Sequence, residues 1–133
     1  MGLRKEDDQH SSEYNHASYC RGCKYFDAED FVEAIKCFKE ALEYWPEDPQ
    51  AWMALGNCYS ELKRHKKAEE SFQRALELSE EENVKEGIIY NLGNSLSDQQ
   101  RYLEAVEMYE RIRPGSEVWR LAQLNVRFAK SRI

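Results

Sequence analysis

The sequence repeats itself every 34 residues, and no other feature constrains its fold as strongly. One stretch places the same residue types as the next, with Gly22, Tyr25, Ala34, Phe38 and Ala41 followed by Gly56, Tyr59, Ala68, Phe72 and Ala75. A third copy follows at a spacing of 37 residues, where Leu92, Gly93, Asn94, Ala105 and Tyr109 match Leu55, Gly56, Asn57, Ala68 and Phe72. The extra three residues fall in EEENVKE, where a helix can lengthen by a turn. A period of this length is typical of stacked copies of one structural unit.

The apolar spacing within each copy is helical. Apolar and small residues recur at i, i+3, i+4 and i+7, which places their side chains on one face of a helix. The second copy has one such set before the polar link ELKRHKK and one after it, namely Trp52, Leu55, Gly56 and Tyr59, then Ala68, Phe72, Ala75 and Leu76. We therefore predict an all-α protein in which each copy is a pair of antiparallel helices.

This pattern resembles the tetratricopeptide repeat (TPR), whose signature is W-x2-L-G-x2-Y, then A-x3-F, then Pro, on a period of about 34 residues. The second copy matches this signature nearly throughout and has Glu80 in place of the proline. The first and third copies keep the glycine and the alanine but have Ser18 and Ile89 in place of the tryptophan. The resemblance covers about residues 15–114. It implies a right-handed superhelix of three helix pairs, over about residues 15–48, 49–82 and 86–114.

The two flanks differ from the repeats. Residues 1–13 are polar and charged, so we predict a disordered tail there and a single domain over residues 14–133. Pro114-Gly115 should end the last repeat. We expect residues 116–132 to form a capping helix, with Ser116 as its N-cap.

The predicted capping helix has two apolar stripes and a net charge of +3. One stripe, Trp119, Ala122, Val126 and Ala129, should cover the third repeat. The other stripe consists of Leu121, Leu124 and Phe128. Either this second stripe is a modest surface patch, or it docks on a partner or on a second copy of the chain, which would cause self-association.

The resemblance implies that the first helix of each pair lines a concave groove. The positions left free of core packing are the candidate partner-binding residues: Tyr19, Cys23, Phe26, Asp27, Met53, Asn57, Glu61, Tyr90, Asn94 and Asp98. Tyr19, Met53 and Tyr90 form an apolar row, and Asp27, Glu61 and Asp98 form an acidic row. We therefore expect the bound segment to carry apolar and basic residues.

The best-known peptide site of this family is a basic clamp for the acidic C-terminal tail of chaperones. The matching positions here are Tyr19, Cys23, Ala54, Gly87 and Asn91, and none of them is Lys or Arg. The resemblance therefore argues against binding of that tail.

Composition excludes several other classes of function. A net charge of −6 disfavours nucleic acid and anionic membranes, and no apolar run approaches the roughly 20 residues that span a bilayer. The start of the chain does not read as a secretory signal, so we expect a cytoplasmic protein. The Cys20-x-x-Cys23 pair has no second pair to complete a metal site, and no catalytic motif occurs, so we predict no cofactor, no metal and no enzymatic activity.

The sequence thus predicts a protein–protein interaction module, or scaffold, that holds a partner segment in its groove. The alternative is a structural subunit or adaptor of a larger assembly, joined through its convex face or its C-terminal helix.

Overall fold

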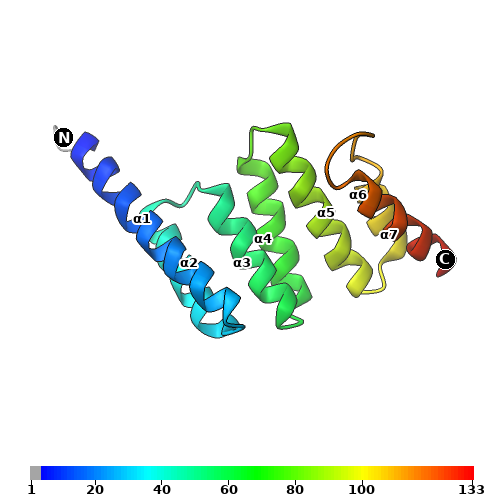
Figure 1. Cartoon of the computed structure of the whole chain (residues 1–133), viewed down its shortest axis with the longest axis horizontal. Helices are drawn as coiled ribbons and strands as arrows, with labels where there is room; N and C mark the ends of the chain where they lie inside the picture. Colours follow the sequence, from blue (N-terminus) through cyan, green and yellow to red (C-terminus); the bar gives the residue numbers. More distant parts are fainter. Residues whose placement is uncertain (1–3) are drawn as a thin grey trace.

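The computed structural model describes the backbone of residues 4–133 and the side chains of residues 16–133. Over this range the chain forms helices and no strand, which confirms the predicted all-α class. Figure 1 shows the helices side by side along the long axis, with the two termini at opposite ends. The helices are α1 (Arg4–Asp27), α2 (Phe31–Tyr44), α3 (Pro49–Glu61), α4 (His65–Leu78), α5 (Glu82–Asp98), α6 (Tyr102–Tyr109) and α7 (Trp119–Ser131).

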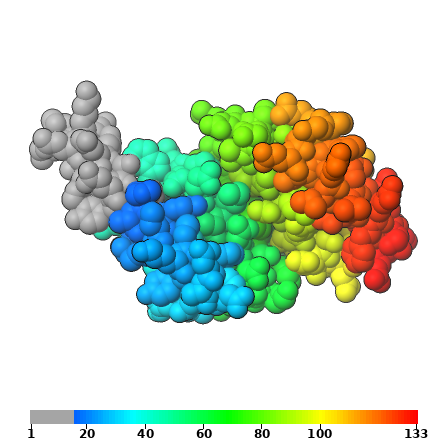
Figure 2. Space-filling view, viewed as in Figure 1, coloured from blue at the N-terminus to red at the C-terminus, as the bar shows by residue number. Residues whose placement is uncertain are grey.

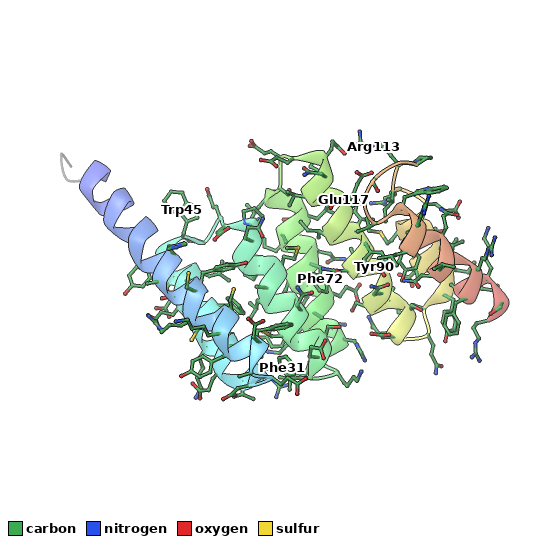
Figure 3. All side chains as sticks on the ribbon, viewed as in Figure 1. Phe31, Trp45, Phe72, Tyr90, Arg113 and Glu117 are labelled. Carbon is green, nitrogen blue, oxygen red and sulfur yellow. The ribbon has the colours of Figure 1, made fainter. Side chains whose placement is uncertain are left out.

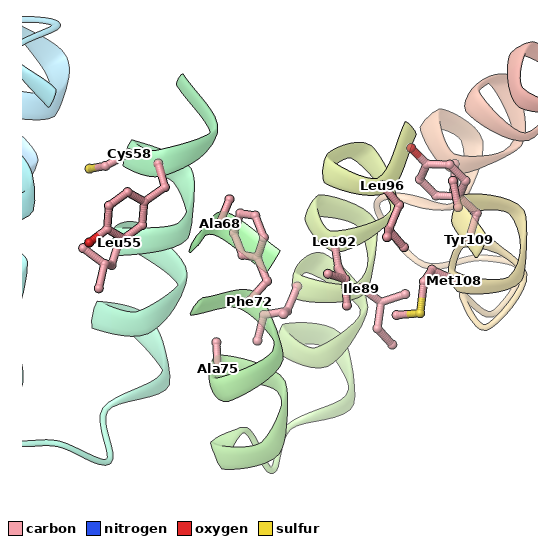
Figure 4. Packing of buried hydrophobic residues seen from close by; sticks show 14 of the residues in the cluster. Leu55, Cys58, Ala68, Phe72, Ala75, Ile89, Leu92, Leu96, Met108 and Tyr109 are labelled. Carbon is pink, nitrogen blue, oxygen red and sulfur yellow. The ribbon is translucent and has the colours of Figure 1, made fainter. Parts of the chain in front are cut away.

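Each helix pair is held by one glycine on its first helix and one aromatic ring on its second. A Cβ atom added to Gly22, Gly56 or Gly93 would lie 2.5 or 2.6 Å from a ring carbon of Phe38, Phe72 or Tyr109, respectively. Beside these rings, Ala34, Ala68 and Ala105 are completely buried. Figure 4 shows Phe72 and Tyr109 within the layer of buried side chains that runs through the stack. The small residues that repeat in the sequence are therefore the points of closest helix approach.

The same turn joins the two helices of every pair. Glu29, Lys63 and Gln100 each adopt a left-handed backbone, with φ of 62°, 62° and 63°. The next amide donates to the carbonyl five residues earlier, as in the bond from Arg64 N to Tyr59 O at 2.8 Å. This is the Schellman arrangement, which satisfies the last carbonyls of a helix.

Contacts between helices join near neighbours along the chain. Each helix packs on the one that follows it, and in addition α3 contacts α5 and α5 contacts α7. The core is therefore a continuous layer rather than a central cluster, as expected for a repeat architecture.

The loop before α7 is fixed by an ion pair with α5. The buried carboxylate of Glu86 accepts hydrogen bonds from the backbone N, Nε and Nη2 of Arg113, at 2.8, 3.2 and 3.1 Å. Figure 3 labels Arg113 beside the loop that leads from α6 to α7. Residues 113–118 then form tight turns, so α7 begins at Trp119 with Val118 as its N-cap. The predicted N-cap at Ser116 is wrong, because these turns hold that residue three positions before the helix.

The remaining expectations about the flanks have different outcomes. Ala122, Val126 and Ala129 are buried, which confirms that their stripe covers the third repeat. α5 is 17 residues long against 13 for α3, which places the extra turn where the sequence predicts it. The predicted tail, residues 1–13, lies outside the residues whose side chains are described. The disorder of that tail and the division into domain and repeats stay predictions.

Candidate functional site

The predicted partner-binding residues lie on α1, α3 and α5, the first helices of the three pairs. Seven of them are half-buried, and the three acidic ones are exposed. We call the surface that these ten residues form the groove face. Figure 2 shows the surface of the stack in chain order along the long axis, from α1 in blue to α7 in orange and red.

Side-chain amides connect successive first helices on this face. Asn91 Nδ2 on α5 donates to Asn57 Oδ1 on α3 at 3.3 Å. Asn125 Nδ2 on α7 donates to Asn94 Oδ1 on α5 at 2.8 Å, and Tyr109 OH donates to the same oxygen. The amide oxygens of Asn57 and Asn94 are therefore engaged within the fold, which leaves their NH2 groups for a partner.

The first junction of the stack lacks this amide pair. Cys23 stands on α1 where the repeat places Asn57 on α3, and Ala54 stands on α3 where it places Asn91 on α5. A hollow of about 150 Å³ lies there between α1 and α3. Its lining consists of Tyr19, Cys23, Phe26, Asp27, Phe38, Ala54 and Asn57. The structure thus brings five of the ten predicted residues around one cavity.

Apart from Asp27, the residues that line this hollow are uncharged. The Phe38 ring is 1% exposed and packs against Tyr19, with ring centroids 5.4 Å apart. Burial raises the pKa of Tyr19 to about 12 and also raises the pKa of the Cys23 thiol. Both groups are therefore protonated and neutral near pH 7, and Asp27 is the one charged residue in the lining.

The acidic row lies at the ends of helices. Asp27, Glu61 and Asp98 are the last residues of α1, α3 and α5. A helix C-terminus carries a partial negative charge, which disfavours a carboxylate there. Within the part of the chain whose side chains are described, none of the three forms an ion pair. A cation from another molecule would therefore meet carboxylates that the fold does not neutralise.

The other predicted residues lie outside the hollow. Met53 is half-buried against the core, and Tyr90 packs on Tyr109 with ring centroids 6.1 Å apart. Figure 3 labels Tyr90 on α5. Tyr90 OH also accepts a hydrogen bond from Asn125 Nδ2 at 3.4 Å, so this tyrosine lies at the junction with α7.

The spacing of Leu121, Leu124, Asn125 and Phe128 is that of a first repeat helix, but sequence reasoning missed the register in which α7 continues the groove face. Asn125 takes the place on α7 that Asn91 takes on α5, one period of 34 residues later. By the same register Leu121, Leu124 and Phe128 follow Gly87, Tyr90 and Asn94. These three side chains are 49%, 59% and 48% exposed. The spacing between Asn91 and Asn125 is the sequence signal that could have revealed the register.

The described residues around Cys20 and Cys23 do not form a metal-binding cluster. Cys20 is exposed, with its Sγ 3.6 Å from Nε2 of His16. Among the described residues no three His, Cys, Asp or Glu side chains are grouped so as to hold a metal ion. In the same part of the chain, no helix is both long and apolar enough to span a membrane.

Comparisons with known proteins agree with this geometry. Two family models described as tetratricopeptide repeat match residues 20–83 and 87–113. A search of curated protein sequences finds no match.

Several solved structures are similar in fold. One is the TPR2B domain of yeast Sti1 in a complex with pHsp70, with a TM-score of 0.84, 16% identity, and coverage of 92% of this chain and 100% of that one. Another is the first TPR of Spaghetti (RPAP3) bound to the HSP90 peptide SRMEEVD, with a TM-score of 0.79, 23% identity and coverage of 90% and 93%. A third is the second TPR domain of human RPAP3 in complex with the HSP70 peptide SGPTIEEVD, with a TM-score of 0.76, 15% identity and coverage of 92% and 96%. At these identities the likeness shows the fold.

Proposed function

The chain belongs to the tetratricopeptide repeat family, and we propose that it is a protein-interaction module that holds a peptide segment of a partner on its groove face. The observation that carries the proposal is the partly exposed row of Tyr19, Met53 and Tyr90 beside three unneutralised carboxylates. Aromatic and Met side chains are enriched at the centres of protein interfaces. The role is binding rather than catalysis, and the cytoplasmic location stays a prediction.

The register of α7 extends the apolar row by one helix. Leu124 follows Tyr90 in the row, so four first helices in succession present an apolar side chain at this position. Each helix adds roughly one more contact point along an extended segment. Such a row favours a partner with apolar residues spread along its length rather than a single anchor.

The acidic row supplies the charge preference. Asp27, Glu61 and Asp98 are exposed and lie on one edge of the groove face, at the ends of α1, α3 and α5. Exposed charges of one sign accelerate association with a segment of the opposite sign. We therefore expect Lys or Arg in the bound segment, with association that weakens as salt increases.

The test uses a library of random twelve-residue peptides displayed on phage as a defined probe. The wild-type protein should select peptides that combine apolar and basic residues, and synthetic copies should bind in calorimetry. Tyr90→Ala should weaken binding, and the triple change of Asp27, Glu61 and Asp98 to Lys should remove most of its salt dependence. Glu43→Lys, an exposed change on α2, is the matched control. Equal binding by folded groove variants and by the control would refute the proposal.

We also propose that this groove does not take the acidic chaperone tail. The positions of the basic clamp are occupied by Tyr19, Cys23 and Ala54, which line a hollow without basic residues, and by Gly87 and Asn91, of which the latter donates to Asn57. The carboxylates of the acidic row would repel a tail that ends in EEVD. Calorimetry with the peptide SRMEEVD should show no binding, and a micromolar Kd would prove this proposal wrong.

The alternative function is that of a structural subunit joined to a larger assembly through α7. The half-exposed Leu121, Leu124 and Phe128 are the observation that favours it, and a second copy is one candidate for the occupant. Analytical ultracentrifugation at low salt should then show self-association that Leu124→Glu abolishes without unfolding. A monomer at high protein concentration would exclude self-docking and leave the groove as the binding surface.

A further inference from the structure

The hollow between α1 and α3 exists because the first junction lacks an amide pair. At the two later junctions Asn91 and Asn125 extend toward the preceding first helix and donate to Asn57 and Asn94. Ala54 takes their place at the first junction and ends at its Cβ atom. The space that an asparagine side chain fills elsewhere is open here.

The size of the hollow fits one side chain. Its volume is about 150 Å³. An apolar protein cavity of roughly this volume binds a molecule the size of benzene. A leucine, methionine or phenylalanine side chain from another molecule therefore has room to enter.

The lining selects an apolar group. Three aromatic residues, Tyr19, Phe26 and Phe38, surround the space together with the methyl group of Ala54, and Asn57 adds one polar side chain. The Cys23 thiol is half-buried and does not supply a charge. A charged group buried against these rings would lose its water, and the one charge in the lining is the exposed Asp27 carboxylate, so full burial there favours hydrocarbon.

Asp27 sets the charge beside the hollow. This carboxylate lines the hollow, is exposed, and ends α1, where the helix dipole adds to its negative charge. Lys24 precedes it by one turn, yet no ion pair joins the two side chains. A residue next to the buried side chain is therefore favoured if it is Lys or Arg and disfavoured if it is Asp or Glu.

We propose that the hollow between α1 and α3 binds one leucine-, methionine- or phenylalanine-sized side chain of a partner segment, with an adjacent Lys or Arg that faces Asp27. This inference rests on the proposed function and names the dominant anchor within it. Full burial of such a side chain is worth about ten- to a hundredfold in affinity. One side chain anchored in the hollow would also fix the register of an extended segment along the groove face.

The experiment compares the wild-type protein with Ala54→Asn and Ala54→Leu, both of which fill the hollow from within. Ala54 is half-exposed, and asparagine already occupies the equivalent places on α5 and α7, so we expect both variants to fold, with circular dichroism as the check. Peptides selected from the random library by the wild-type protein should bind both variants at least tenfold more weakly. Asp27→Asn should relax the preference for Lys or Arg next to the apolar residue, whereas Glu43→Gln, an exposed change on α2 outside the groove face, should leave that preference intact.

A second readout locates the peptide. Cys23 lines the hollow, whereas Cys20, one turn earlier on the same helix, is exposed and lies outside the lining. Saturating peptide should slow alkylation of Cys23 by iodoacetamide at pH 9, measured by mass spectrometry, and leave the rate at Cys20 nearly unchanged. Equal protection of both cysteines, or of neither, would overturn the placement.

The outcomes separate the two proposals. Selected peptides that bind the wild type and the Ala54 variants equally would overturn the hollow as an anchor site and leave the groove proposal standing. If the wild-type protein selects no peptide, both proposals fail.

Discussion

The glycines of this chain offer a direct test of how the helix pairs are held. Gly56 and Gly87 both lie inside helices, α3 and α5. Replacing a glycine inside a helix by alanine adds about 0.5–1 kcal/mol of stability when nothing else changes. A Cβ atom on Gly87 meets no other atom within 4 Å. Gly87→Ala should therefore raise the free energy of unfolding by about that amount.

Gly56→Ala gains the same helix propensity but collides with its partner helix. The new Cβ atom would lie 2.6 Å from Cε1 of Phe72. Carbon atoms pack at about 3.5–4.0 Å, so the ring or the helix must move by roughly 1 Å. Phe72 is 1% exposed, and Ala68 and Ala75 on the same helix are fully buried, so the ring cannot move without displacing other buried atoms. Overpacking of this kind costs about 1–3 kcal/mol.

The two variants should therefore differ by about 1–3 kcal/mol, with Gly87→Ala the more stable. Urea denaturation followed by circular dichroism measures the difference. In thermal melts it corresponds to about 3–5 °C per kcal/mol for a domain of this size. Because both changes add the same methyl group to a helical glycine, helix propensity cancels in the comparison. Equal stability, or a more stable Gly56→Ala protein, would refute the glycine–aromatic contact as the determinant of pairing.

Three further predictions concern the loop ion pair and the turns. Glu86→Gln should lower the urea midpoint at pH 7, because the amide has no charge and one acceptor oxygen, whereas Arg113 donates to both oxygens of the carboxylate; an unchanged midpoint would show that the loop does not depend on these bonds. The N–H donors of Arg113 lower the pKa of Glu86, so its contribution to stability is complete above the unfolded value of about 4.3 and is lost as the pH falls through the lower folded value. Acid titration of unfolding should therefore show a smaller loss for Glu86→Gln than for the wild type, and parallel curves would contradict this. Lys63→Gly should stabilise the protein by about 0.5–1 kcal/mol, because Lys63 has a φ of 62° and glycine adopts that conformation without a Cβ clash; a lower melting temperature would count against it.

The repeat units were predictable from sequence because each depends on a few local, repeated contacts. Gly56 and Phe72 are 16 residues apart, and their spacing alone indicates a helix pair closed by a ring against a backbone. The exposure of the three acidic residues on the groove face could also be predicted, since they recur at the same place on each first helix.

The features that escaped prediction depend on relations between units. The hollow beside Ala54 exists because alanine has no amide to fill the space and donate to the neighbouring helix. A comparison of matching residues between repeats does not reveal a side chain that is missing. The register of α7 is marked by the hydrogen bonds from Asn125 to Asn94 and Tyr90, both of which lie on another helix, α5. The wrong prediction of Ser116 as the N-cap has a similar cause. The loop before α7 is fixed by the hydrogen bond from Arg113 to Glu86, which lies on α5, 27 residues earlier in the sequence.

The chain of nearest-neighbour helix contacts has a kinetic consequence. Because the helices pack mainly on those next to them in sequence, the contact order is low, and folding on the order of milliseconds or faster is expected. Unfolding can also start at an end, since a terminal pair gives up contacts on one side only. The first pair is joined to the rest of the stack chiefly where α2 packs on α3. Fraying of this pair would erase the hollow between α1 and α3 while the remaining helices stay folded, so the lifetime of that pocket is set by the opening rate of one end rather than by global unfolding.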